Sequence, residues 1–172
     1  VEHDGPDTGG FGAFRHQRAN GLGAGGLVAL GAAHALVERR RSGQRVTSVR
    51  TPTKTISAGQ FVVCSGAWSQ SVLTHAGCSI QVAPVRGQIV LLETLPLPTR
   101  RIIEIGSRYI VPRADGRLLV GSTEEHVGFE KRNTAEAVAE LLRFGSELIP
   151  SLKSARFEQC WSGLRPGSPN GL

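Results

Sequence analysis

The sequence predicts an α+β fold, in which a mixed, largely antiparallel sheet with flanking helices is joined to a remnant of a Rossmann-like domain. Alternating apolar and polar residues predict several strands within 81–123. Residues 133–149 form the clearest helical pattern. An almost wholly apolar segment, 60–64, leads into a glycine-containing turn of the kind found in nucleotide-binding domains.

Composition argues against nucleic-acid binding. The 172 residues are 40% hydrophobic and 20% charged, which is ordinary for a globular protein. The net charge of +6 comes from 17 Arg against 3 Lys, but these residues are scattered and aromatic residues make up only 5%. Proteins that bind single-stranded nucleic acid interleave aromatic and basic residues. We therefore expect no nucleic-acid partner.

The cysteines and the hydropathy pattern indicate the compartment. Cys64, Cys78 and Cys160 are odd in number and lack CxxC spacing, so we expect neither a disulfide framework nor a metal site. Cys64, inside a predicted strand, is expected to be a small buried hydrophobe. No apolar run approaches the ~20 residues that a membrane span needs, and no signal-peptide pattern is present. We expect a cytoplasmic protein and leave open whether it forms a homo-oligomer.

The first part of the chain is glycine-rich. Residues 1–26 hold 8 of the 22 glycines, which predicts poor order or a long loop. Apolar residues at helical spacing predict a helix over 26–41, with the arginine triplet 39–41 in its last turn. Residues 45–58 are predicted to form a hairpin that turns near Pro52. Residues 60–64 are predicted to be a strand buried on both faces, followed by a short helix that ends near residue 77.

The second half is richer in strands. Residues 81–93 and 101–123 are predicted strands, and Asp115-Gly116 predicts a hairpin turn. The helix over 133–149 is expected to be capped by Asn133, with Glu136 completing a capping box. Pro150 should stop this helix, and 155–161 should form the last strand.

The glycines of 21–26 satisfy the G-x-G-x-x-G pattern, which presents backbone N–H groups to a pyrophosphate. The pattern also requires a preceding strand, and residues 15–20 do not resemble one. A glycine-rich tract satisfies it by chance, so both interpretations stay open.

Four further segments are candidates for a site. Ser65-Gly66-Ala67-Trp68 follows the apolar strand, where small residues allow a ligand close to the backbone, although a plain turn with Ser69 as a cap explains it too. Pro84–Gln88 contains Gly87, which suggests a β-bulge. Tyr109 precedes the Asp115-Gly116 turn, and a lone tyrosine in a strand is often a packing residue.

The fourth segment, Trp161–Leu172, holds Arg165 between Leu164 and Pro166. A guanidinium presents a rigid fork that matches a carboxylate in a bidentate pair. Arg165 is therefore the strongest candidate for binding a substrate carboxylate, although a surface arginine is the ordinary alternative.

Together these segments resemble the D-amino-acid oxidase and glycine oxidase family of flavoenzymes. The strings FVVCSGAWS, PVRGQ, YIVPRADGRLLVGST and WSGLRP occur in the family's order, and the resemblance runs from about residue 45 to 172. It implies that Tyr109 and Arg165 bind substrate. It also implies cofactor-binding residues along the chain, namely Ser65, Gly66, Ala67, Trp68, Gly87, Gln88 and Gly163.

The resemblance implies an FAD-dependent oxidation of glycine or a D-amino acid to an imine, with oxygen reoxidising the flavin. No side chain is then needed as a catalytic acid or base. We expect a partial FAD-binding domain at 27–80, a substrate-binding domain at 81–161 and a truncated return to the FAD-binding domain at 162–172. We expect the chain by itself to be inactive. A non-catalytic domain that binds a carboxylate ligand or a protein partner is the alternative.

Overall fold

The computed structural model describes residues 27–31, 38–42, 45–50 and 55–169, and the side chains from residue 46 onward within these ranges. The chain folds as two compact units, Val1–Ser79 and Ile80–Leu172. The G-x-G-x-x-G pattern at 21–26 and the turn near Pro52 lie outside the described residues. Within the described part, no helix has the length and apolarity to cross a membrane.

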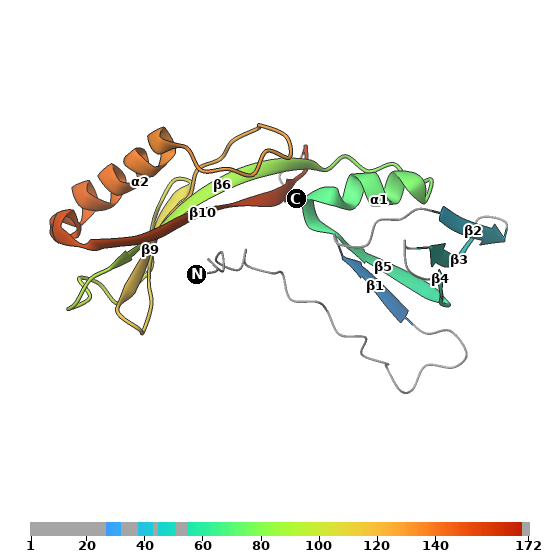
Figure 1. Cartoon of the computed structure of the whole chain (residues 1–172), viewed down its shortest axis with the longest axis horizontal. Helices are drawn as coiled ribbons and strands as arrows, with labels where there is room; N and C mark the ends of the chain where they lie inside the picture. Colours follow the sequence, from blue (N-terminus) through green and yellow to red (C-terminus); the bar gives the residue numbers. More distant parts are fainter. Residues whose placement is uncertain (1–26, 32–37, 43–44, 51–54, 170–172) are drawn as a thin grey trace, which may run out of the picture. The chain divides into compact units, whose positions relative to one another are not determined.

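Two sheets are formed by the described residues of the first unit (Figure 1). In one, β1 (Leu27–Gly31) pairs in parallel with β5 (Gln60–Cys64). The other has the antiparallel order β2-β3-β4. Its strands cover Glu38–Ser42 (β2), Arg45–Arg50 (β3) and Thr55–Ser57 (β4). The predicted hairpin over 45–58 is thus confirmed.

The helix predicted over 26–41 is wrong, because this segment contributes the two strands β1 and β2. A short apolar run such as Leu27–Leu30 fits a helix or a strand equally well, and pairing with β5 decides between them. The arginine triplet 39–41 accordingly lies in β2, paired with β3, rather than in the last turn of a helix.

The strand β5 is confirmed, and it pairs in parallel with β1. Burial on both faces is wrong, because exposure alternates along the strand and Val62 is 42% exposed. Cys64 is also exposed rather than buried. A 3-10 turn, Gly66–Trp68, and the helix α1 (Ser69–His75) follow β5. The predicted short helix is therefore confirmed.

The second unit is a five-stranded antiparallel sheet in the order β10-β6-β9-β8-β7. Its strands cover Ala83–Glu93 (β6), Ile103–Ile105 (β7), Arg108–Pro112 (β8), Arg117–Gly121 (β9) and Arg156–Gly167 (β10). The hairpin at Asp115-Gly116 is confirmed, with Gly116 at a φ of 84°. The last strand is longer than the predicted 155–161 and includes Arg165.

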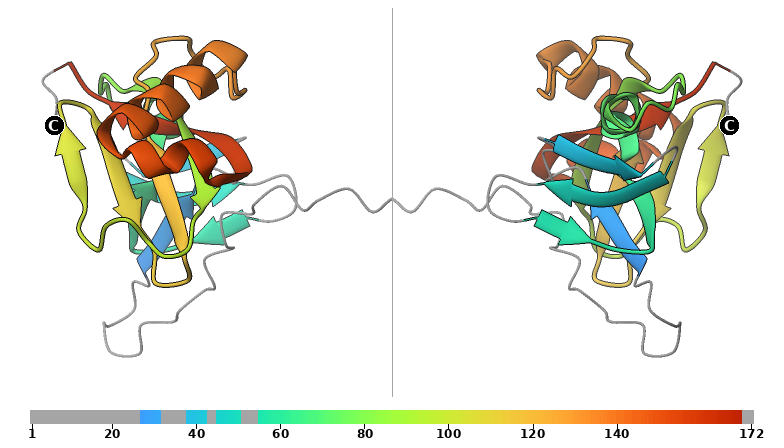
Figure 2. Two further views of the ribbon diagram at one scale, coloured as in Figure 1. Left: turned by 90° about the vertical axis from the view of Figure 1, so that its left-hand side faces the viewer. Right: turned by 90° about the vertical axis from the view of Figure 1, so that its right-hand side faces the viewer.

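The helix α2 (Ala135–Leu148) covers one face of this sheet, as Figure 1 and Figure 2 show from different sides. The core between them consists of buried aliphatic side chains, namely Val90, Leu92, Ile110, Leu118, Val120, Leu141 and Leu152. Gly145 lets the helix approach closely, because a Cβ there would lie 3.3 Å from the Val120 side chain. Burial of each large aliphatic side chain contributes about 1.5–3 kcal/mol.

The predicted boundary of α2 is confirmed at its C-terminal end but not at its N-terminal end. Pro150 begins a 3-10 turn (Pro150–Ser154) directly after the helix, as predicted. At the other end Thr134, not Asn133, is the cap, because its hydroxyl accepts a hydrogen bond from Ala137 N. The predicted capping box of Asn133 and Glu136 is therefore wrong.

Candidate functional site

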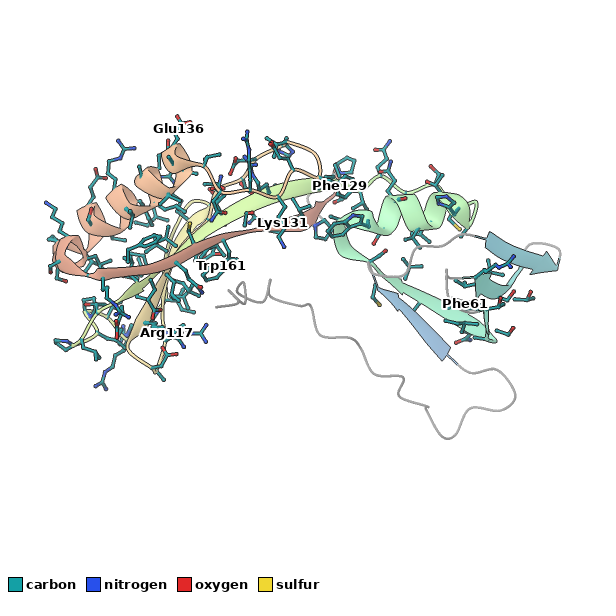
Figure 3. All side chains as sticks on the ribbon, in the orientation of Figure 1. Phe61, Arg117, Phe129, Lys131, Glu136 and Trp161 are labelled. Atoms are coloured by element: carbon teal, nitrogen blue, oxygen red, sulfur yellow. The ribbon has the colours of Figure 1, made fainter. Side chains whose placement is uncertain are left out.

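A straight row of residues crosses four strands on the sheet face that points away from α2. Trp161 lies opposite Ile89, Ile89 opposite Gly121, and Gly121 opposite Tyr109. Directly opposed residues in antiparallel strands project to the same face, and every second residue along a strand shares it. Figure 3 shows Trp161 on the side of the sheet away from α2. We call this face the open face.

Arg165 lies on the open face, four residues beyond Trp161 on β10, and reaches across β6. Its Nη2 donates a 2.6 Å hydrogen bond to the Thr123 carbonyl, and its Nη1 donates at 3.3 Å to Ser122 Oγ. The guanidinium passes over Gly87, where a Cβ would lie 2.8 Å from Nη2. Gly87 pairs in regular register with Gly163, so it is not the bulge that the sequence suggested. It provides space for the guanidinium instead.

Tyr109 approaches the same place from the other side. Its ring lies over Gly121, where a Cβ would be 2.8 Å from the ring and 2.9 Å from the hydroxyl oxygen. The tyrosine hydroxyl and the Arg165 guanidinium thus lie at the adjacent residues Gly121 and Ser122. The structure therefore brings together the two residues that the sequence singled out for substrate binding.

Gly163 adds room beside Arg165. It lies on the open face between Trp161 and Arg165, and a Cβ there would meet nothing within 4 Å. A flat group can therefore approach the backbone of β10 at this point. This is one observed feature that fits a planar ring system.

Gln88 projects to the opposite face, toward α2. Its side chain is fully buried and bonds at both ends: Nε2 donates to Glu125 Oε1 (2.8 Å), and Oε1 accepts from Thr134 N (2.8 Å). The amide therefore ties β6 to the start of α2. Any contribution of Gln88 to the open face is made through its backbone.

Glu125 belongs to the same buried network. Its carboxylate accepts hydrogen bonds from Arg86, whose side chain is 4% exposed, and from the Thr123 hydroxyl. Burial of the carboxyl opposes ionisation, but the hydrogen bonds from Arg86, Thr123 and Gln88, with the charge of Arg86, outweigh it and lower the pKa of Glu125 to about 2. Glu125 is therefore part of a hydrogen-bonded network and is not a freely solvated loop residue.

The remaining predicted residues lie in the first unit, at the end of β5. Ser65 and Ala67 are 1% exposed, whereas Trp68 is 40% exposed. Gly66 has a φ of +53°, a conformation that favours glycine, and a Cβ there would meet nothing within 4 Å. In parallel sheets, ligands bind beyond the carboxyl ends of the strands, where this turn lies.

Sequence reasoning missed the part that Gly121, Ser122, Thr123, Glu125 and Arg86 play in the site. One signal was available: a glycine inside a strand often marks a close approach of another group, and Gly121 ends β9. The others had no local signal, because Arg86 and Glu125 are 39 residues apart and meet only through the register of the sheet.

Comparisons with known proteins show the family of the chain. The family model described as FAD dependent oxidoreductase (DAO) matches residues 17–172. Glycine oxidase of Pseudomonas putida is 41% identical over 128 residues, which are 74% of this chain and 35% of that protein. Glycine oxidase of Pseudomonas aeruginosa is 39% identical over 132 residues, 77% of this chain and 36% of that protein. The chain thus spans about 35% of the length of these relatives.

Solved structures give the same result. The crystal structure of glycine oxidase from Geobacillus kaustophilus matches with a TM-score of 0.74 and 31% identity, over 80% of this chain and 37% of that one. Iminodiacetate oxidase from Chelativorans sp. BNC1 matches with a TM-score of 0.70 and 28% identity, over 77% of this chain and 37% of that one. The chain belongs to the DAO family of FAD dependent oxidoreductases.

Proposed function

We propose that the chain supplies the substrate-binding part of an FAD-dependent enzyme that oxidises a small amino acid, glycine or a D-amino acid, to its imine. The observation that carries this proposal is the convergence of Arg165 and Tyr109 at Gly121 and Ser122 on the open face. The names of the relatives, glycine oxidase and iminodiacetate oxidase, support a small substrate that carries an amine and a carboxylate.

Arg165 would bind the substrate carboxylate. A guanidinium has five N–H donors, and two of them are used by Thr123 and Ser122. Within the described residues, the other three have no protein acceptor. A carboxylate can therefore form a bidentate pair with a cation whose orientation is already set. The Tyr109 hydroxyl lies where it could hydrogen-bond to the same substrate.

The residues present fit a flavin at two places, the open space over Gly163 and the exposed backbone at Gly66. FAD, when bound, supplies the redox chemistry: it accepts the electron pair of the amine's α-C–H bond, and oxygen then takes these electrons to give hydrogen peroxide. Water hydrolyses the imine to a carbonyl compound and ammonia. The protein's part is to hold the amino acid by its carboxylate, so no side-chain acid or base is required if the amine is neutral.

We assign residues 27–80, which include the turn Ser65–Trp68, to the partial FAD-binding domain. Residues 81–161 are assigned to the substrate-binding domain. Residues 162–172 would return to the cofactor. Gly163 would contact it directly. Ser65 and Ala67, which are buried, would contact it through their backbone. Gly87 and Gln88 would act indirectly, because the first lies under the Arg165 guanidinium and the second is bonded to Glu125 and Thr134.

The experiment is the visible spectrum of the purified chain after incubation with excess FAD and desalting, followed by addition of glycine or D-alanine without oxygen. Retained flavin absorbance that glycine or D-alanine bleaches supports the proposal, and Arg165→Ala should abolish the bleaching. A folded chain that retains no flavin contradicts cofactor binding by these residues.

Retained flavin without bleaching would favour a second candidate, a domain that binds a carboxylate ligand without oxidising it. The free donors of Arg165 favour this alternative specifically, since they need no flavin to hold a carboxylate.

A further inference from the structure

The segment after β9 departs from the regular sheet at the point where Arg165 is held. Ile89 pairs with Gly121, but the next bridge joins Arg86 to Glu125. Three residues, 122–124, therefore lie opposite two residues of β6, Gly87 and Gln88. Such an extra residue bends the strand and re-aims its polar groups.

The polar group that changes direction here is the carbonyl of Thr123. The Thr123 N–H donates to the Gln88 carbonyl at 3.3 Å, which is half of an antiparallel pair. The returning bond would run from Gln88 N to the Thr123 carbonyl. Gln88 N donates instead to the Thr123 hydroxyl at 2.9 Å. The Thr123 carbonyl is thereby left to accept from Arg165.

The hydroxyl can accept from Gln88 N only if its own proton points elsewhere. A hydroxyl has one donor and two acceptor positions. The Thr123 hydroxyl donates its proton to Glu125 Oε1. The Glu125 carboxylate is itself held in place by two other side chains. The Arg86 guanidinium donates to its Oε2, and the Gln88 amide donates to its Oε1.

We propose that Glu125 and Thr123 are positioning residues for Arg165. The Glu125 carboxylate sets the direction of the Thr123 hydroxyl, the hydroxyl replaces the Thr123 carbonyl in the sheet, and the carbonyl holds the guanidinium. The buried Arg86–Glu125 pair on the α2 side thus orients the cation on the open face. This inference rests on the proposed function of Arg165 as a carboxylate-binding residue, and it adds the residues that orient the cation.

Thr123 gives the matched pair of variants that tests the idea. Thr123→Val keeps the shape but removes the hydroxyl, so Gln88 N loses its acceptor and competes with Arg165 for the Thr123 carbonyl. Thr123→Ser keeps the hydroxyl. Substitutions of Glu125 are less suitable, because they deprive the buried cation of Arg86 of its nearest partner.

The measurement is NMR of the chain with ¹⁵N-labelled arginine, with the Arg165 signals assigned by Arg165→Lys, followed by titration with acetate. In the parent chain and in Thr123→Ser, we expect slow rotation of the Arg165 guanidinium and dissociation constants for acetate within about twofold of each other. In Thr123→Val, rotation should become fast and acetate should bind about fivefold more weakly, a loss of the size expected for one ordinary hydrogen bond.

Unchanged Arg165 signals and affinity in Thr123→Val would overturn the proposal, as would equal losses in the valine and serine variants. These readouts need neither flavin nor turnover. A failure of the proposed oxidation would therefore leave this result standing, and a failure here would not affect the flavin experiment.

Discussion

The two faces of the five-stranded sheet differ in how completely their polar and charged side chains are hydrogen-bonded to the protein. On the α2 side, Arg86 and Gln88 are 3% and 0% exposed, and Glu125 bonds to both of them. On the open face, Arg165 is exposed and has two bonds to the protein, with donors to spare. Buried charges need complete pairing to be tolerated, whereas a binding residue needs unused donors. The comparison therefore separates residues that hold the fold from residues that can hold a ligand.

The largest effect that we expect is the loss of stability in Glu125→Gln. The Arg86 side chain is 4% exposed, and without the Glu125 carboxylate it keeps only the more distant carboxylate of Glu130, at 3.6 Å. Loss of the nearer partner of a buried charge costs about 3 kcal/mol. The free energy of unfolding of the second unit can be measured by hydrogen exchange of the Val90 and Val120 amides.

The matched control is Glu140→Gln, which breaks the more exposed Arg108–Glu140 pair (2.9 Å, side chains 37% and 38% exposed). Exposed pairs contribute below about 1 kcal/mol. Equal losses in the two glutamine variants would remove the distinction that we draw between buried and exposed charges in this unit.

A pH dependence of stability should follow from the same carboxyl. The pKa of Glu125 is lowered from 4.5 to about 2 in the folded chain, so the unfolded state binds the proton more tightly. The stabilisation by Glu125 is complete above about pH 4.5 and is lost as the pH falls toward 2. The stability difference between the parent chain and Glu125→Gln should therefore shrink across this window.

The Glu130 carboxylate also faces Arg86, at 3.6 Å. The pH series is therefore repeated in a Glu130→Gln background, which isolates the contribution of Glu125. A stability difference that stays constant from pH 5 to pH 2.5 would argue against ionic binding of Glu125 by Arg86.

Two glycines of the open face should differ although they lie opposite each other. Gly87→Ala places a Cβ 2.8 Å from the Arg165 guanidinium, so the guanidinium must move and acetate should bind more weakly. Because this side-chain end is exposed and can shift, the loss of stability should stay below about 1 kcal/mol. Gly163→Ala meets open space and should change stability by less than about 0.5 kcal/mol. Thermal unfolding and acetate titration compare them, and retention of FAD by Gly163→Ala tests whether the cofactor approaches there.

The sequence predicted the second unit better than the first for a physical reason. The turn at Asp115-Gly116 and the stop at Pro150 are local effects of glycine and proline, and both are confirmed. The segment 26–41 has no such signal, and its apolar run became a strand because β5 lies beside it. Local pattern predicts an element well when local chemistry decides its structure.

The site divides in the same way. Arg165 and Tyr109 were identified because each lies in a sequence motif that resembles the family. In the structure their side chains reach the adjacent residues Gly121 and Ser122. The spaces over Gly87 and Gly121 depend on which residues lie across the neighbouring strands, and one residue of register would change them. The Asn133 cap failed for a related reason, since Gln88 of β6 bonds Thr134 N and so fixes where the helix begins.

The residue with the greatest effect on binding, Arg165, should have only a small effect on stability. Arg165→Lys keeps the positive charge but lacks the planar fork, so it cannot hold a carboxylate in a bidentate pair or span Ser122 and Thr123 together. We expect acetate to bind about tenfold more weakly, whereas the free energy of unfolding should change by less than about 1 kcal/mol because the side chain is exposed. Hydrogen exchange and the acetate titration measure both quantities on the same sample. A loss of several kcal/mol in stability would place Arg165 with the residues that hold the fold, and the distinction between the two faces would then disappear.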